Sequence, residues 1–176
     1  MKNKTIQFAH GLILLPFLTI GSPLAMFNTN FALKASVQES MISEIDLQAE
    51  HAQKIDAYFA KRAMPLEGYG AKLAQVALDN DIDWRLLPAI AIKESTGGKF
   101  ACHNNPFGWG SCKIKFKSFD EAIDTVAKNL GGNNPKTARY YDDATIEEIL
   151  HHYNGSVIPA YPGEVMKFME LIEAGK

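Results

Sequence analysis

The sequence has 176 residues, of which 47% are hydrophobic and 22% are charged, and its formal net charge is -2. This mixture is typical of a globular chain and excludes a disordered protein, a collagen-like repeat and a polytopic membrane protein. The near-neutral charge argues against a general nucleic-acid-binding protein, because neutralising phosphates requires a basic surface. We therefore expect one domain of ordinary size with an additional segment at one end.

Residues 1–35 have the order of a secretory leader. Lys2 and Lys4 precede an apolar stretch over residues 8–20, and residues 1–35 contain no acidic side chain. This order predicts a cleaved signal peptide, and the alternative is an uncleaved membrane tether formed by residues 6–27. Either outcome places the domain outside the cytoplasm. Without the leader, which holds three of the 18 basic residues and none of the 20 acidic ones, the formal charge falls to -5.

Helical periodicity extends over the rest of the chain. Residues 36–64 are expected to contain a linker up to residue 43 and then a helix that starts at Ser43 and Asp46. Residues 65–176 are expected to form the main domain, mostly α, with about six or seven helices in the whole chain. The expected helices of this domain span residues 68–78, 83–96, 118–130, a short segment from 134, 145–155 and 162–174, and a short strand or hairpin is expected at 113–117.

Two cysteines, Cys102 and Cys112, bracket a glycine-rich loop. An even number of cysteines in an exported chain predicts a disulfide, which would restrict the conformational freedom of this loop. A zinc site is not expected, because a metal needs more ligands and only His103 lies beside a cysteine.

Glu94 is the residue whose position most favours catalysis. It follows a nearly uncharged helical segment, residues 86–92, and a carboxylate beside a buried helix face loses hydration, which favours its protonated form. The negative end of the helix dipole acts in the same direction. A carboxylic acid that stays protonated near neutral pH is what acid-assisted glycoside cleavage requires. The alternative is a solvated carboxylate at a helix end, paired with Lys93 or Lys99.

Amide and aromatic side chains crowd the loop between the two cysteines. Asn104 and Asn105 could bond the acetamido and hydroxyl groups of a sugar. Phe107 and Trp109 could cover the apolar C–H face of the same sugar. The alternative is a structural loop whose aromatic side chains pack into the core.

Three short motifs carry a resemblance to known families. Glu94-Ser95, followed by Asn104-Asn105-Pro106-Phe107-Gly108, resembles the glucosaminidase-type domain of bacterial autolysins, the mannosyl-glycoprotein endo-β-N-acetylglucosaminidase-like domain. The lysozyme-like superfamily, which includes lytic transglycosylases, also places its catalytic Glu before Ser at a helix end. Tyr153-Asn154-Gly155 with Pro162-Gly163-Glu164-Val165 is similar to the Tyr-Asn segment near the end of transglycosylase domains. The resemblance covers about residues 65–173.

The resemblance implies a lysozyme-like fold and a peptidoglycan substrate, the glycan of alternating N-acetylglucosamine and N-acetylmuramic acid. It implies that Glu94 is the general acid and that Tyr153 faces it across the cleft, with Asn154 fixing this tyrosine or the sugar. No metal and no organic cofactor are expected. The other residues expected to contact the substrate are Ser95, Asn104, Asn105, Phe107 and Trp109.

Two departures from the family patterns leave the choice of the cleaved glycosidic bond open. Thr96-Gly97-Gly98 stands where autolysin glucosaminidases usually have Gly-Trp-Gly, and Gly108-Trp109-Gly110 stands where transglycosylases usually have a Gly-Leu-Met-type turn. No second catalytic carboxylate is evident, so the substrate's own acetamido group or its muramic acid 6-hydroxyl could act instead.

We expect first an endo-β-N-acetylglucosaminidase-like hydrolase, secreted or anchored facing the cell wall. The alternatives are a lytic transglycosylase that leaves anhydro-muramic ends, and a non-catalytic glycan-binding or assembly module on the same fold. We expect a monomer whose partner is the peptidoglycan strand rather than a nucleic acid.

Overall fold

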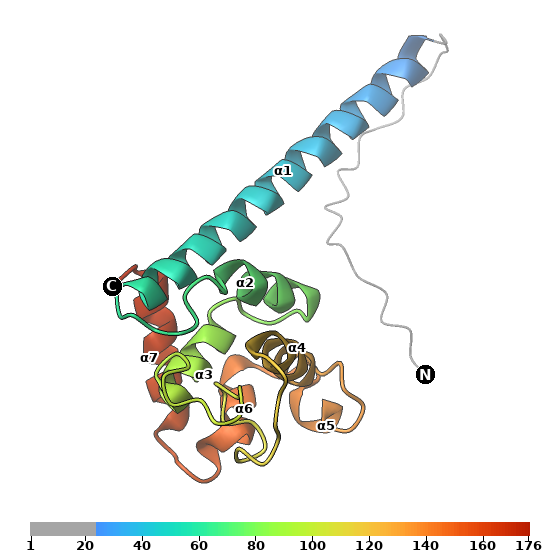
Figure 1. The fold of residues 1–176 in the computed structure, drawn as a ribbon. Coiled ribbons are helices and arrows are strands. Elements are labelled where there is room, and N and C mark those ends of the chain that lie inside the picture. The colour runs from blue at the N-terminus through green and yellow to red at the C-terminus, as the bar shows by residue number, and fades with distance from the viewer. Residues whose placement is uncertain (1–23) are drawn as a thin grey trace. The chain divides into compact units, whose positions relative to one another are not determined.

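The computed structural model describes residues 24–176 (Figure 1). Most of the expected leader falls on residues 1–23, which lie outside the described residues. Within residues 24–176, no helix combines the length and the apolar character needed to cross a membrane. The same residues form seven α-helices, one π-helical turn and no β-strand. The prediction of a mostly α chain is therefore confirmed for the described residues.

The first helix, α1, spans Leu24–Ala60, so the linker expected over residues 36–43 and the helix start expected at Ser43 are wrong. Two serines in this stretch are used as helix-interior residues. The hydroxyls of Ser36 and Ser40 donate to the carbonyls three residues earlier, at 2.9 and 2.8 Å. A serine that bonds a preceding carbonyl is compatible with a continuous helix, and no Gly or Pro interrupts this one.

Residues from Met41 onward form one compact unit, in which six further α-helices follow α1. Two of their starts are fixed by caps that the sequence predicted. The Ser118 side chain accepts from the Glu121 N–H at 3.3 Å, and Thr145 with Glu148 forms a complete capping box. The helices are α2 (Gly70–Asp79), α3 (Leu86–Ser95), α4 (Phe119–Leu130), α5 (Ala138–Tyr141), α6 (Ile146–Leu150) and α7 (Tyr161–Glu173), and the π-helical turn His151–Gly155 continues α6.

The strand expected at residues 113–117 does not form. Residues 111 and 112 have φ angles of 55° and 58°, which turn the chain before an extended segment can begin. The Asn104 side-chain amide donates to the carbonyls of Phe116 and Lys117 at 3.0 and 3.1 Å. A side chain therefore takes the backbone acceptors that a neighbouring strand would have used.

Helix α3 lies at the centre of the core of this compact unit. Every residue from Leu86 to Ile92 is buried, and a helix that is apolar on all sides must be enclosed by other elements. α7 packs along α3, and α2 and α4 also contact it (Figure 1). The surrounding helices thus fix the C-terminal end of α3, which carries Glu94 and Ser95.

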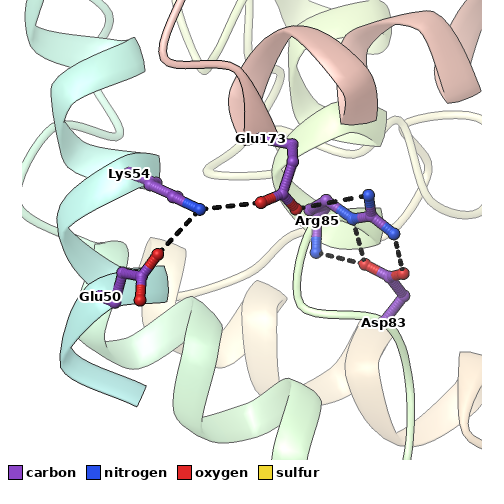
Figure 2. Close-up of polar contacts among 5 residues, drawn as sticks. All are labelled: Glu50, Lys54, Asp83, Arg85 and Glu173. Carbon is purple, nitrogen blue, oxygen red and sulfur yellow. Dashed lines mark hydrogen bonds and ion pairs between the residues drawn. The ribbon is translucent and has the colours of Figure 1, made fainter. Parts of the chain in front are cut away.

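A polar network joins three segments of the compact unit (Figure 2). Lys54 on α1 contacts Glu50 at 2.9 Å and Glu173 at the end of α7 at 2.8 Å. Arg85, just before α3, donates from Nε to Asp83 at 2.9 Å and lies 3.4 Å from Glu173. Such partly exposed pairs each contribute about 1 kcal/mol or less. We therefore infer that this network aligns the three segments and that the core supplies most of the stability.

Replacing Ile90 by Ala tests the central position of α3. Ile90 is fully buried, so the change should leave a cavity and lower the free energy of unfolding by about 2–5 kcal/mol. The matched control is Leu78→Ala on α2, whose side chain is 49% exposed and whose loss should cost about 0.5 kcal/mol. Chemical denaturation measures both values, and equal losses would contradict a core centred on α3.

Candidate active site

Glu94, in the last turn of α3, opens onto a cleft of about 510 Å³. Three segments distant in sequence supply its walls, namely the end of α3, the loop between the two cysteines, and the region from α5 to the π-helical turn. Four of the expected site residues therefore meet in one place. The residues that line the cleft are Glu94, Gly108, Trp109, Gly110, Ser111, Tyr141, Tyr153 and Asn154.

The carboxyl group of Glu94 is half-buried and accepts a hydrogen bond from Tyr161 Oη at Oε1, 2.7 Å away. Burial raises the pKa of Glu94, whereas the hydrogen bond from Tyr161 and the positive charge of Lys93 act in the opposite direction. Burial outweighs both, so the pKa lies above that of an ordinary glutamate. This carboxyl group therefore retains its proton to a higher pH than an exposed one does.

Lys93 and Lys99, the ion-pair partners considered for Glu94, are engaged elsewhere. Lys93 Nζ lies 2.7 Å from a carboxylate oxygen of Glu164 on α7. Lys99 Nζ donates to the carbonyl of Arg62 at 3.1 Å. The interpretation of Glu94 as one half of an ion pair with Lys93 or Lys99 is therefore not supported by the contacts.

Tyr161 was not among the residues expected at the site. It is fully buried at the first position of α7, and burial, together with the neighbouring Tyr153 and the negative charge of Glu94, raises its pKa. The hydroxyl consequently stays protonated and remains a hydrogen-bond donor to the carboxyl group. The only signal in the sequence was its position beside the Pro162-Gly163 start of the last helix.

Tyr153 lines the cleft as expected, but its hydroxyl bonds the loop rather than the acid. The hydroxyl donates to the carbonyl of Phe107 at 2.5 Å, and its ring stacks on Tyr161 with centroids 5.9 Å apart. Burial and the negative charge of Glu94 raise its pKa, so this donor is also retained. Tyr153 therefore fixes the loop while its ring forms part of the cleft wall.

Tyr153 and Asn154 belong to the π-helical turn His151–Gly155, a local widening of the helix that is frequent at functional sites. Gly155 is buried, and a Cβ there would lie 3.1 Å from Pro162, so the turn packs closely on the start of α7. The Asn154 amide lines the cleft and makes no side-chain hydrogen bond to another of the described residues. It is therefore available to a ligand.

Asn105 and Ser95 hold the loop from behind the cleft. The Asn105 side chain donates to the carbonyl of Trp109 at 2.8 Å and accepts from its N–H at 3.1 Å. The Ser95 hydroxyl donates to the carbonyl of Pro106 at 2.7 Å. These bonds join the end of α3 to the loop that carries Trp109.

Asn104 and Phe107 also lie away from the cleft surface. Asn104 is exposed and bonds the backbone at residues 116 and 117, while the Phe107 side chain is fully buried in the core. Direct contact of a ligand with these side chains stays a prediction. Among the expected site residues, those that do not line the cleft are Ser95, Asn104, Asn105 and Phe107.

Gly108 brings the loop against the acid. Its φ is 64°, and a Cβ placed there would lie 2.8 Å from Glu94 Oε2. A residue with a side chain would be strained in this conformation and would displace the carboxyl group. The glycine is therefore required for the close approach of the loop backbone to Glu94.

The expected disulfide between Cys102 and Cys112 is present, with Cα atoms 6.0 Å apart. Gly110 and Ser111, which line the cleft, precede Cys112 directly. The disulfide therefore ties this outer wall of the cleft to the start of the loop. Because Asn105 already bonds Trp109, the disulfide acts mainly on the residues that follow Trp109.

The cleft combines one acid with aromatic walls. Glu94 is the one acid among the described residues that line it. The Trp109 ring lies 5.6 Å from that of Tyr153 and 6.3 Å from that of Tyr141. Aromatic faces of this kind suit the apolar C–H surface of a sugar ring. No three His, Cys, Asp or Glu side chains within residues 24–176 are grouped so that they could hold a metal ion.

No family model and no solved structure matches the chain. A DNA ligase from Rickettsia conorii is 25% identical over 109 residues, which cover 59% of this chain and 16% of the ligase. The chain thus spans less than a fifth of the ligase that it resembles. At this identity and coverage the similarity shows no family.

Gly108→Ala should move the Glu94 carboxyl group. A positive φ costs an alanine about 1 kcal/mol, and the added Cβ also meets Glu94 Oε2. The matched control is Gly68→Ala, where φ is 87° and nothing lies within 4 Å of the added Cβ. Both variants should lose stability in thermal unfolding because of the positive φ, but only Gly108→Ala should change the side-chain carboxyl titration of Glu94 followed by NMR. An unchanged titration would contradict the contact.

Glu94→Gln should stabilise the protein at high pH and not at low pH. Because the pKa of Glu94 is raised in the folded state, the stability of the wild type falls as the pH rises through that value. The variant lacks this loss, since a glutamine can accept the same bond from Tyr161 without carrying a charge. The difference in melting temperature should therefore be near zero at about pH 4 and positive at about pH 8. Glu67→Gln, at an exposed position, is the control for the Glu-to-Gln substitution itself.

Proposed function

We propose that this protein cleaves the β-1,4-linked glycan of peptidoglycan on a lysozyme-like fold, with Glu94 as the general acid. The observation that carries the proposal is a half-buried carboxyl group with a raised pKa that opens onto an aromatic-walled cleft. The motifs Glu94-Ser95 and Tyr153-Asn154 supply the resemblance to peptidoglycan glycosidases, and both lie at this cleft or directly behind it. The leader pattern of residues 1–35 and the disulfide support action outside the cytoplasm.

In the proposed reaction, the protonated carboxyl group of Glu94 donates its proton to the glycosidic oxygen as the C1–O bond breaks. Tyr161 orients the carboxyl group through the bond to Oε1. The positive charge that develops at C1 and the ring oxygen lies beside the carboxylate that the proton leaves behind. Trp109 and Tyr153 cover the sugar, and the Asn154 amide bonds one of its polar groups.

The cleft offers no second carboxylate among its described lining residues, so the substrate supplies the nucleophile. In the first candidate reaction, the acetamido oxygen attacks C1 and water then opens the resulting oxazolinium ion, with Glu94 accepting a proton from that water. This gives the glucosaminidase-like hydrolysis. In the second candidate reaction, the muramic acid 6-hydroxyl attacks C1 and its proton passes to Glu94. This gives the anhydro-muramic end of a lytic transglycosylase. A single acid among the described residues of the cleft favours this reaction equally.

Digestion of purified peptidoglycan by the wild type and by Glu94→Gln tests the proposal. Loss of the acid should reduce cleavage by at least about a hundredfold, whereas Glu67→Gln should leave it unchanged. Mass spectrometry of the new ends separates the reactions, because reducing glucosamine ends mean a glucosaminidase and anhydro-muramic ends mean a transglycosylase. Full activity of Glu94→Gln would exclude the assigned acid. Retention of glycan without new ends, unaffected by Glu94→Gln, would identify the non-catalytic binding module.

A further inference from the structure

Aromatic rings continue from the cleft onto the surrounding surface. Tyr141, which lines the cleft and lies 6.3 Å from Trp109, is also in contact with Tyr140 and His152, at 6.3 and 6.4 Å between ring centroids. Tyr140 and His152 are in turn 5.4 Å apart. The rings near Glu94 and those outside the cleft therefore form one connected series.

The outer residues of this series are exposed to solvent, and the Arg139 side chain adds a positive charge to them. The Tyr140 side chain is 39% exposed, and His152 and Arg139 are exposed as well. The Arg139 guanidinium lies over the Tyr140 ring, 4.5 Å from its centroid, and donates to the Tyr140 hydroxyl at 2.6 Å. We call Arg139, Tyr140 and His152 the rim platform.

The Arg139 guanidinium makes no ion pair with any of the described residues. Its bond to Tyr140 uses one Nη2–H, and the other donors of the planar group are left for a ligand. Glu148 of α6, an acid that interacts with the His152 side chain, is engaged by the Thr145 N–H and hydroxyl, at 2.8 and 2.9 Å. An arginine stacked on an aromatic ring loses little further freedom when it binds a carboxylate in its fork.

We propose that the rim platform is a subsite for an anionic sugar, one that carries a carboxylate beside its ring. The inference rests on the proposed function and adds a subsite outside its cleft. The His152 ring receives the sugar face, and Arg139, which lies over the Tyr140 ring, bonds the carboxylate. In peptidoglycan this carboxylate comes either from the lactyl group of muramic acid or from a peptide stem attached to it. The platform thereby favours peptidoglycan over a neutral polymer of N-acetylglucosamine.

Calorimetric titration of the full chain carrying Glu94→Gln tests this subsite without cleavage. The probes are chitotetraose, a stem-free tetrasaccharide of alternating N-acetylglucosamine and N-acetylmuramic acid with free lactyl carboxylates, and the same tetrasaccharide with peptide stems. Adding Arg139→Gln should weaken binding of at least one carboxylate-bearing probe about tenfold and leave chitotetraose unchanged. The probe that is affected identifies the source of the carboxylate. Lys128→Gln, which removes an exposed cation of α4, should change none of the three affinities.

Two results would overturn the inference, and they differ in what they say of the proposed function. Equal weakening of all three probes by Arg139→Gln, or weakening of none, would remove the anionic subsite and leave the proposed function standing. Failure of the Glu94→Gln protein to bind any of the three would contradict the proposed substrate itself. Circular dichroism of each variant confirms that a lost affinity does not reflect a lost fold.

Discussion

The site depends on the close packing of the loop between Cys102 and Cys112 against the end of α3. The Ser95 hydroxyl bonds the Pro106 carbonyl, and the backbone of Gly108 lies against the carboxyl group of Glu94. Because α3 is enclosed on all sides, its end has little freedom to move, and the loop takes its position from it. The acid and the Trp109 wall of the cleft are therefore positioned by the same contact.

Burial and hydrogen bonding act in opposite directions on the pKa of Glu94. Burial favours the protonated form of Glu94, while the bond from Tyr161 favours the charged form. A tyrosine donates a neutral hydrogen bond, which orients the carboxyl group and lowers its pKa less than a cation in the same place would. Lys93, the nearest cation in sequence, is drawn to Glu164 on α7. The fold thus raises the pKa of Glu94 and fixes the orientation of its carboxyl group.

Local signals in the sequence predicted the helices well wherever a cap or a glycine marks an end. The capping box at Thr145 and the cap at Ser118 are both present. The same reasoning failed at Ser43, because a Ser followed by an acid resembles a helix start whether or not the helix has already begun. The alternating pattern of residues 113–117 failed for another reason, since the side chain of Asn104 bonds the backbone there.

For the site, the sequence predicted four of the residues that line the cleft but not the direction in which their polar groups point. The sequence predicted Glu94 and Trp109 from their local positions and Tyr153 from the resemblance, and all three line one cleft. It could not distinguish the Asn105 amide, which bonds the Trp109 backbone, from the Asn154 amide, which lines the cleft. Tyr161 was missed because its role requires a contact between the first residue of α7 and the last turn of α3, which no local pattern encodes.

The distribution of polar groups bears on specificity. Most amide and hydroxyl groups of the cleft loop are bonded within the protein, so they shape the site and leave few donors for a ligand. Aromatic faces bind sugars with little discrimination between them, since every pyranose presents an apolar face. Discrimination must then come from polar groups that remain available, among them the Asn154 amide in the cleft and the Arg139 guanidinium outside it. A neutral amide near the acid and a cation farther out suit the proposed substrate, a glycan whose backbone is uncharged and whose substituents carry carboxylates.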